Sequence, residues 1–277
     1  MIKFPFSLFE KDEANVIVFG ISYNKESEKS LKQLREISYF VEPFDFLGNN
    51  LLQNAKVFDA GNFKIKNLEE VSNIFRRIKN EDKVPLMLSR GHLPTLYTVK
   101  NLKKEKLIVL DAHADCKNEY LDSIIAIDVD RNKDRKKFNG STWLRRLIEE
   151  SGIQVLLIGI RAFDKEEIKF LEEKGVKYFT SAQILEREKK MLSEIEKFTR
   201  NSEIYLSIDF DIFDPSVFPA VDYPEPGGIG YYEFIEIINA IKGKLIGADV
   251  CCFKPLENNL VSGFLAIKSI FHILSKI

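Results

Sequence analysis

Short runs of apolar residues, many of them β-branched, alternate along the chain with longer segments in which apolar residues recur at helical spacing. The short runs are brief enough to be buried strands, and they lie at 16–19, 84–88, 107–110, 155–158, 204–208 and 245–252. Helical spacing follows Asn67 and Asp164, each of which has a glutamate three residues later, as in a capping box. Further helices fit about 27–40, 142–151, 184–200, 231–242 and 260–275.

This alternation of strand and helix is typical of a parallel sheet that helices cover on both faces. The 277 residues contain no internal repeat, no low-complexity linker and no proline-rich joint. At roughly 150 residues per domain the length would allow two domains, but α/β chains commonly reach this size as one. We therefore expect a single α/β domain over residues 1–277.

Composition excludes several kinds of protein and leaves the function to a local site. The 41 basic and 42 acidic residues nearly cancel, so the chain has no bulk attraction for nucleic acid or anionic lipid. The N-terminal segment lacks the apolar core of a signal peptide, and no stretch approaches the roughly 18 apolar residues of a membrane-spanning helix. We expect a cytoplasmic protein that acts on a small molecule, with neither nucleic-acid nor membrane partners.

Acidic residues and histidines follow three of the predicted strands at the points where the strands end. Side chains alternate along an extended chain, so residues two apart would point the same way. The carboxyl ends of parallel strands also meet at one edge of the sheet. Six residues are therefore expected to converge there, and they include two of the three histidines in the chain: His92, Asp111, His113, Asp115, Asp209 and Asp211.

These six residues predict a metal site. A single aspartate at a strand end is often only a helix cap, but four carboxylates in one crevice repel each other unless cations are bound. Mixed carboxylate and imidazole ligands suit Mn²⁺, with Zn²⁺, Fe²⁺ or Co²⁺ as competitors. Two such ions roughly 3.5–4 Å apart lower the pKa of a shared water to about 7, which provides hydroxide at neutral pH.

Several of these segments resemble the arginase/agmatinase (ureohydrolase) family. The resemblance rests on DAHAD at 111–115, SIDFDIFDP at 207–215 and PEPGG at 224–228. Shorter matches lie at 90–92, 139–146 and 159–161. The resemblance implies a three-layer α/β/α sandwich with a mostly parallel sheet of about eight strands, and a homo-oligomer, trimer or hexamer.

The resemblance also implies how two manganese ions would be held. One ion would be bound by His92, Asp111, Asp115 and Asp209. The other would be bound by Asp111, His113, Asp209 and Asp211. Asp111 and Asp209 would then bridge the ions, and Asp115 would take a catalytic part by orienting the hydroxide between them.

Two positions depart from the family's pattern. Asn139 stands where the family normally has a histidine that shuttles a proton to the leaving amine, and asparagine cannot titrate near pH 7. Cys252 stands where a glutamate usually binds the guanidinium group of the substrate, and cysteine offers neither its charge nor its two oxygens. Asp222 and Glu225, in a neighbouring loop, are candidates for a replacement anion.

The resemblance implies a binuclear manganese-dependent hydrolase of a C–N bond in an amidino, guanidino or formimino compound, acting through a metal-bridging hydroxide. The two departures leave two alternatives open. One is a hydrolase of an amide or acylated amine on the same scaffold, and the other is a non-catalytic metal-binding relative. The presence of all six ligand positions counts against the last, because unused buried carboxylates are costly.

Overall fold

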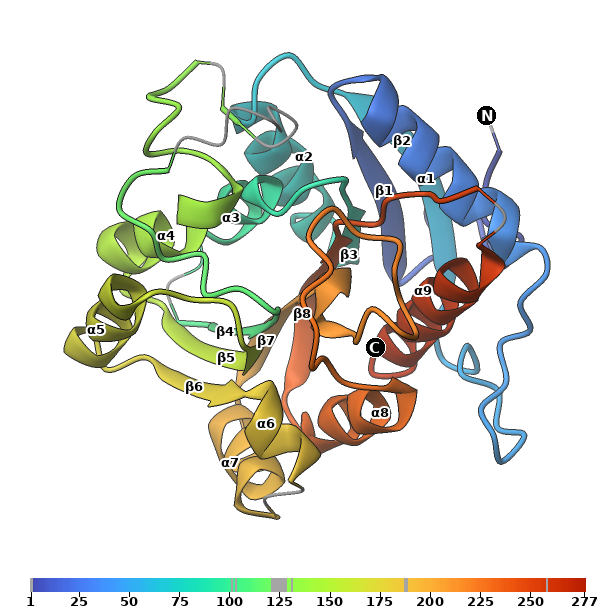
Figure 1. Cartoon of the computed structure of the whole chain (residues 1–277). Coiled ribbons are helices and arrows are strands. Elements are labelled where there is room, and N and C mark those ends of the chain that lie inside the picture. The colour runs from blue at the N-terminus through green and yellow to red at the C-terminus, as the bar shows by residue number, and fades with distance from the viewer. Residues whose placement is uncertain are drawn as a thin grey trace.

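The computed structural model describes residues 2–277 except 101, 103, 121–128, 131, 187, 188 and 258. Within the described residues, eight strands form one sheet in the order β2-β1-β3-β8-β7-β4-β5-β6, and every neighbouring pair is parallel (Figure 1). The strands are β1 (Val16–Ser22), β2 (Val57–Lys64), β3 (Val84–Leu88), β4 (Lys106–Leu110), β5 (Gln154–Ile160), β6 (Lys177–Thr180), β7 (Glu203–Asp209) and β8 (Lys244–Cys251).

Helices cover both faces of the sheet, which gives three layers. One apolar core lies between the sheet and α2 to α5, and the other lies between the sheet and α1 with α6 to α9. The helices are α1 (Lys25–Ser38), α2 (Glu69–Lys79), α3 (Leu93–Val99), α4 (Trp143–Ser151), α5 (Lys165–Glu173), α6 (Ser181–Leu185), α7 (Lys189–Thr199), α8 (Tyr231–Ala240) and α9 (Leu260–Leu274), with short 3-10 turns η1 (Gly140–Thr142) and η2 (Phe210–Ile212). The predicted α/β/α sandwich is confirmed.

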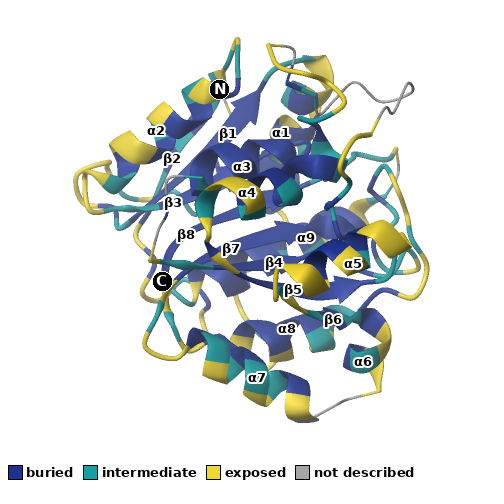
Figure 2. Ribbon diagram, turned by 90° about the vertical axis from the view of Figure 1, so that its left-hand side faces the viewer, coloured by how far each residue is buried: buried dark blue, intermediate teal, exposed yellow. Residues whose placement is uncertain are grey.

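The strands read as apolar runs in the sequence because helices cover both faces of the sheet. Val16 and Val18 of β1 pack in one core, while Ile17 and Phe19 pack in the other. A strand that is buried on both faces has no polar face and therefore reads as an unbroken apolar run. Figure 2 shows the central strands buried between the helical layers.

Most predicted elements are present, with a few corrections. All six predicted strands form, whereas β2, β6 and α3 were not expected. The predicted helix over 184–200 is two helices, α6 and α7, and residues 187 and 188 between them lie outside the described part of the chain. Asp164 caps α5 as expected. The side chain of Asn67 does not cap α2, where Leu68 is the N-cap residue.

A buried ion pair joins α1 to the edge strand β2. Arg35 Nε lies 2.7 Å from Asp59 Oδ2, and Arg35 Nη2 donates to Asp59 Oδ1 at 2.9 Å. Both side chains are almost completely buried. The backbone N–H of Phe4 also donates to Asp59, so this carboxylate connects the N-terminal segment, the helix and the strand.

The four central strands, β3, β8, β7 and β4, are neighbours, although the chain passes from β3 to β4 before it forms β7 and β8 (Figure 1). Ligand sites in open α/β sheets lie at the carboxyl ends of strands where the connections change direction. The residues predicted to bind metal lie at or just after the ends of β3, β4 and β7 at this edge. In the described residues, no helix is long and apolar enough to cross a membrane.

Candidate metal centre

The first half of the predicted cluster is centred on His92, the residue that immediately precedes α3. Its Nδ1 atom lies 3.0 Å from Asp111 Oδ2, 3.5 Å from Asp115 Oδ2 and 3.5 Å from Asp209 Oδ2. This nitrogen is buried, and among the described residues it has no partner with hydrogen-bonding geometry. A buried nitrogen that faces three carboxylates in this way is suited to bind a cation.

The other ring nitrogen of His92 shows which tautomer is favoured. His92 Nε2 lies 2.9 Å from Ser207 Oγ, and the Ser207 hydroxyl donates to Asp249 Oδ1 at 2.8 Å. Because the Ser207 hydroxyl donates to Asp249, its oxygen accepts a hydrogen bond from the N–H of Nε2, which leaves Nδ1 as the ring nitrogen that can bind an ion. Ser207 and Asp249 thus orient the His92 ring with Nδ1 toward the carboxylates, a role that we did not predict from the sequence.

The second half of the cluster is centred on His113. Its Nδ1 atom lies 2.8 Å from Asp211 Oδ2 and 3.5 Å from Asp111 Oδ1. Asp111 therefore faces His92 with one oxygen and His113 with the other, as a bridging ligand would. The candidate ligand atoms of His92, Asp111 and Asp115 lie within 4.8 Å of one another, and so do those of Asp111, His113 and Asp211. Asp209 faces His92 through Oδ2, while its Oδ1 accepts the backbone N–H of Asp211 at 2.9 Å.

The electrostatics of the cluster also favour cations. Burial alone would lower the pKa of His92, but Asp111 and Asp115 raise it well above its usual value. Burial and the charge of Asp111 raise the pKa of Asp115 to about 6, and burial with the charges of Asp211 and Asp111 raises the pKa of Asp209. Without ions the cluster therefore retains protons. Divalent ions would replace those protons, so the donor set fits a metal centre.

Asp115 is held in place by a contact between distant parts of the chain. Trp143 Nε1 donates a hydrogen bond to Asp115 Oδ2 at 2.8 Å, and the Trp143 ring is fully buried beside His92. The backbone of Asp115 is left-handed, with φ at 48°, an uncommon conformation for a residue other than glycine. Trp143 is thus a second residue that supports the site and that we did not predict.

Comparison with known proteins agrees with this arrangement. A family model described as the arginase family matches residues 15–275. The chain belongs to the arginase family. The match confirms the family predicted from the three motifs, and it supports the expectation that the chain is a hydrolase.

Relatives across the arginase family match nearly the whole chain. N(1)-aminopropylagmatine ureohydrolase of Thermococcus kodakarensis is 26% identical over 266 residues, which cover 90% of this chain and 86% of that protein. An uncharacterized 32.2 kDa protein of Methanothermus fervidus is 29% identical over 255 residues, 86% of this chain and 84% of its own. The crystal structure of agmatine ureohydrolase of Thermoplasma volcanium matches with a TM-score of 0.83 and 25% identity, over 100% of this chain and 94% of that one.

Asn139, one of the two departures from the family pattern, belongs to the structure of its own loop. Its amide nitrogen donates to the carbonyl oxygens of Tyr120 and Arg135, each at 2.8 Å. Its Oδ1 accepts the backbone N–H of Ser141 at 3.1 Å and so caps η1. The side chain is buried, and these bonds use both its donor and its acceptor. That Asn139 occupies the catalytic proton-shuttle position of the family stays a prediction.

Asp222, one of the two candidates for a replacement anion, is already paired. Asp222 Oδ2 lies 2.5 Å from Arg90 Nη1, and Oδ1 lies 3.0 Å from Lys254 Nζ. Burial alone would raise the pKa of Asp222, but Arg90 and Lys254 lower it, so the carboxylate is charged and neutralised by the protein itself. Its predicted role in substrate binding is untested, and these contacts weigh against it.

Glu225 and Cys252 lie nearer to the cluster. Glu225 Oε1 lies 4.0 Å from His113 Nε2, and the residue is partly exposed. Cys252 directly follows β8 in a left-handed conformation with φ at 66°, it is partly exposed, and its thiol interacts with Asp209. Of the predicted substrate residues, Glu225 therefore offers an anion beside the second half of the cluster, and Cys252 lies beside the first.

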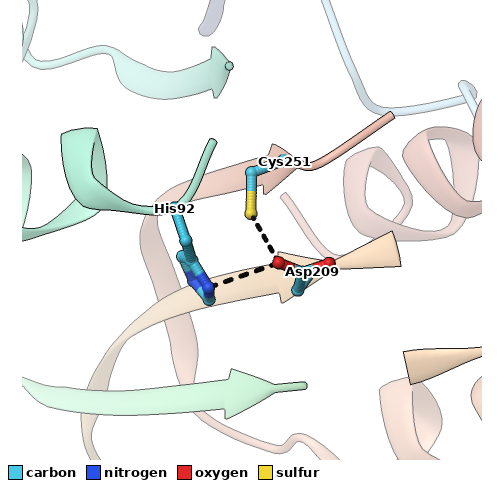
Figure 3. Close-up of side chains that lie close together, drawn as sticks. All are labelled: His92, Asp209 and Cys251. Atoms are coloured by element: carbon cyan, nitrogen blue, oxygen red, sulfur yellow. Dashed lines mark hydrogen bonds and ion pairs between the residues drawn. The ribbon is translucent and has the colours of Figure 1, made fainter. Parts of the chain in front are cut away.

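The structure places one further residue at the cluster, Cys251. Cys251, the last residue of β8, is completely buried, and its thiol donates to Asp209 Oδ2 at a sulfur–oxygen distance of 3.6 Å. Figure 3 shows its sulfur directed toward the same carboxylate oxygen that faces His92. The three side chains together form a further candidate metal-binding group.

Proposed function

We propose that this arginase-family chain is a binuclear metal-dependent hydrolase of a C–N bond in an amidino, guanidino or formimino compound. The observation that carries the proposal is the pair of ligand groups around His92 and His113, which share Asp111. The ligands are carboxylates and imidazoles, which suit two Mn²⁺ ions, with Zn²⁺, Fe²⁺ or Co²⁺ as competitors. The ureohydrolase names of the relatives support this class of substrate.

Two divalent ions bound in this cluster would supply hydroxide at neutral pH by lowering the pKa of a water that they share. The protein's own part is to place the proton acceptor. Trp143 fixes the Asp115 carboxylate beside His92, where it can accept a proton from the attacking water and pass it to the leaving nitrogen. Asn139 cannot carry a proton in this way, and loss of a general acid or base typically costs about 10²- to 10⁴-fold in rate.

The charges around the cluster bear on the substrate. Glu225 is partly exposed and lies beside His113, so its carboxylate is available to a cationic amidino or guanidino group. A charge-assisted hydrogen bond of this kind contributes roughly 1.5–3 kcal/mol. Glu225→Gln should therefore raise KM for a guanidino substrate about 10- to 100-fold, with a smaller effect on kcat.

The proposal is tested by incubating the Mn²⁺-loaded protein with agmatine, arginine, guanidinobutyrate and formiminoglutamate. We expect hydrolysis of at least one compound, measured as release of urea from a guanidino compound or of formamide from formiminoglutamate. Asp111→Asn, which alters the shared ligand, should abolish that activity. If none of the four compounds is hydrolysed while two ions are demonstrably bound, the proposal is wrong.

One observation favours a second candidate, an amide or acylated-amine hydrolase on the same scaffold. Arg90 is buried and paired with Asp222, and Lys254 binds the other oxygen of the same carboxylate. Because this group carries one more positive than negative charge, the side of the site near it does not favour a guanidinium group. Turnover of acylated amines without turnover of guanidines would identify this second function.

A further inference from the structure

The pairing of β7 with β8 places four polar side chains in two rows on one face of the sheet. Ser207 is the register partner of Asp249, and two residues later Asp209 is the partner of Cys251. Residues two apart on a strand point to the same face, so both pairs lie on one side. The hydrogen bond from Ser207 to Asp249 and the contact from Cys251 to Asp209 join the partners within each row.

The imidazole of His92 spans both rows. Its Nε2 contacts Ser207 in the first row, and its Nδ1 lies 3.5 Å from Asp209 Oδ2 in the second. Cys251 approaches that same carboxylate oxygen, with its sulfur 3.6 Å away (Figure 3). His92 is 3% exposed, Asp209 4% and Cys251 0%, so bulk water does not fill the space between them.

Two features distinguish this group from a buried cysteine with a weak hydrogen bond. The first is that the nitrogen, oxygen and sulfur ligand atoms all lie within 4.8 Å of one another. The second is that the buried His92 Nδ1, which faces this group, has no hydrogen-bond partner among the described residues. An imidazole nitrogen, a carboxylate oxygen and a thiol sulfur around one point are a typical donor set for a divalent transition metal.

We propose that Cys251 is a ligand of the ion held by His92 and Asp209. The inference rests on the proposed metal centre and adds a ligand to it. The sulfur binds as a thiolate, and the thiol proton passes to solvent when the ion enters. The contact between Cys251 and Asp209 in the ion-free protein is then replaced by a bond from each of them to the ion.

A thiolate ligand makes the two halves of the centre unequal. Thiolates select soft or borderline ions such as Zn²⁺ and Co²⁺, whereas carboxylates and imidazoles also suit Mn²⁺. The half around His113 contains only nitrogen and oxygen donors. We therefore expect the half around His92 to prefer Zn²⁺ or Co²⁺ over Mn²⁺, and the half around His113 to lack that preference.

The test is an anaerobic titration of the metal-free protein with Co²⁺, followed by absorbance. A cobalt–thiolate bond gives a charge-transfer band in the near ultraviolet that oxygen and nitrogen ligands do not give. We expect the band in the wild type, its loss in Cys251→Ser, and its retention in Cys252→Ser, which removes the adjacent thiol. In parallel, Cys251→Ser should weaken Zn²⁺ binding by at least about 10-fold relative to Mn²⁺ binding.

The outcomes separate this inference from the metal centre on which it rests. If the wild type binds Co²⁺ without the band, or if the band survives in Cys251→Ser, Cys251 is not a ligand and the metal centre stands. If the band disappears in Cys252→Ser and remains in Cys251→Ser, the ligand is the neighbouring cysteine and the inference is wrong. If the wild type binds no Co²⁺, both proposals are wrong.

Discussion

Replacing Asp115 by asparagine should stabilise the protein when no metal is bound. Burial and the negative charge of Asp111 raise the pKa of Asp115 from 3.8 to about 6. A pKa difference of this size corresponds to about 3 kcal/mol of unfavourable free energy for the ionised carboxylate in the folded chain. Asparagine has nearly the same shape and no charge, and its oxygen can still accept the hydrogen bond from Trp143 Nε1.

The expected gain depends on pH. The ion-free folded chain binds a proton on Asp115 more tightly than the unfolded chain does, so this carboxyl contributes stability below its unfolded pKa and loses it as pH rises through about 6. Asp115→Asn should therefore raise the free energy of unfolding by up to about 3 kcal/mol above pH 6, and by little near pH 4. With Mn²⁺ bound the substitution removes a ligand, so its effect should become destabilising.

The assay is urea denaturation of both chains after chelation, at pH about 7.5 and about 4.5, with and without added Mn²⁺. Asp214→Asn is a matched control outside the cluster. The Ser216 side chain, and then the backbone N–H groups of Ser216, Gly227 and Gly228, lower the pKa of Asp214 by hydrogen bonding, so its substitution should destabilise the protein with or without metal. If metal-free Asp115→Asn is no more stable than the wild type at the higher pH, the cluster does not carry the proposed repulsion.

Three further predictions concern single residues. Ser207→Ala frees the His92 ring and should weaken Mn²⁺ binding about 10- to 100-fold in calorimetry; unchanged affinity would contradict the orienting role of Ser207. Arg35→Met leaves Asp59 buried without its partner and should lower the free energy of unfolding by about 3–5 kcal/mol in urea; a loss under about 1 kcal/mol would show that the pair is unimportant. Burial lowers the pKa of His272 to about 4, so in a histidine NMR titration its ring should stay neutral at pH 6, and a midpoint near 6.5 would be inconsistent with the packing.

The strands that could be predicted from the sequence are the ones that helices cover on both faces. The two missed strands, β2 and β6, lie at the edges of the sheet. In β2 the apolar run is broken by Asp59 and Asn62, both of which bind Arg35 of α1, and β6 has only four residues. Helix α3 was missed because all seven of its residues are buried. A helix without a polar face shows no helical alternation of apolar and polar residues in the sequence.

The convergence of the six predicted ligands could be anticipated because parallel strands end at one edge of the sheet. The residues that support them could not be anticipated, because their places depend on contacts between distant segments. Trp143 reaches Asp115 across 28 positions, and Cys251 meets Asp209 only through the register of β7 against β8. Local sequence likewise gave no sign that Asp222 is paired with Arg90.

The most direct test of the account is the anomalous diffraction of crystals grown with excess Mn²⁺ and recorded near the manganese absorption edge. We expect two peaks roughly 3.5–4 Å apart, one beside His92 Nδ1 and the other beside His113 Nδ1, with Asp111 between them. A single peak, or none, at these residues would contradict a binuclear centre and the hydrolytic function proposed from it.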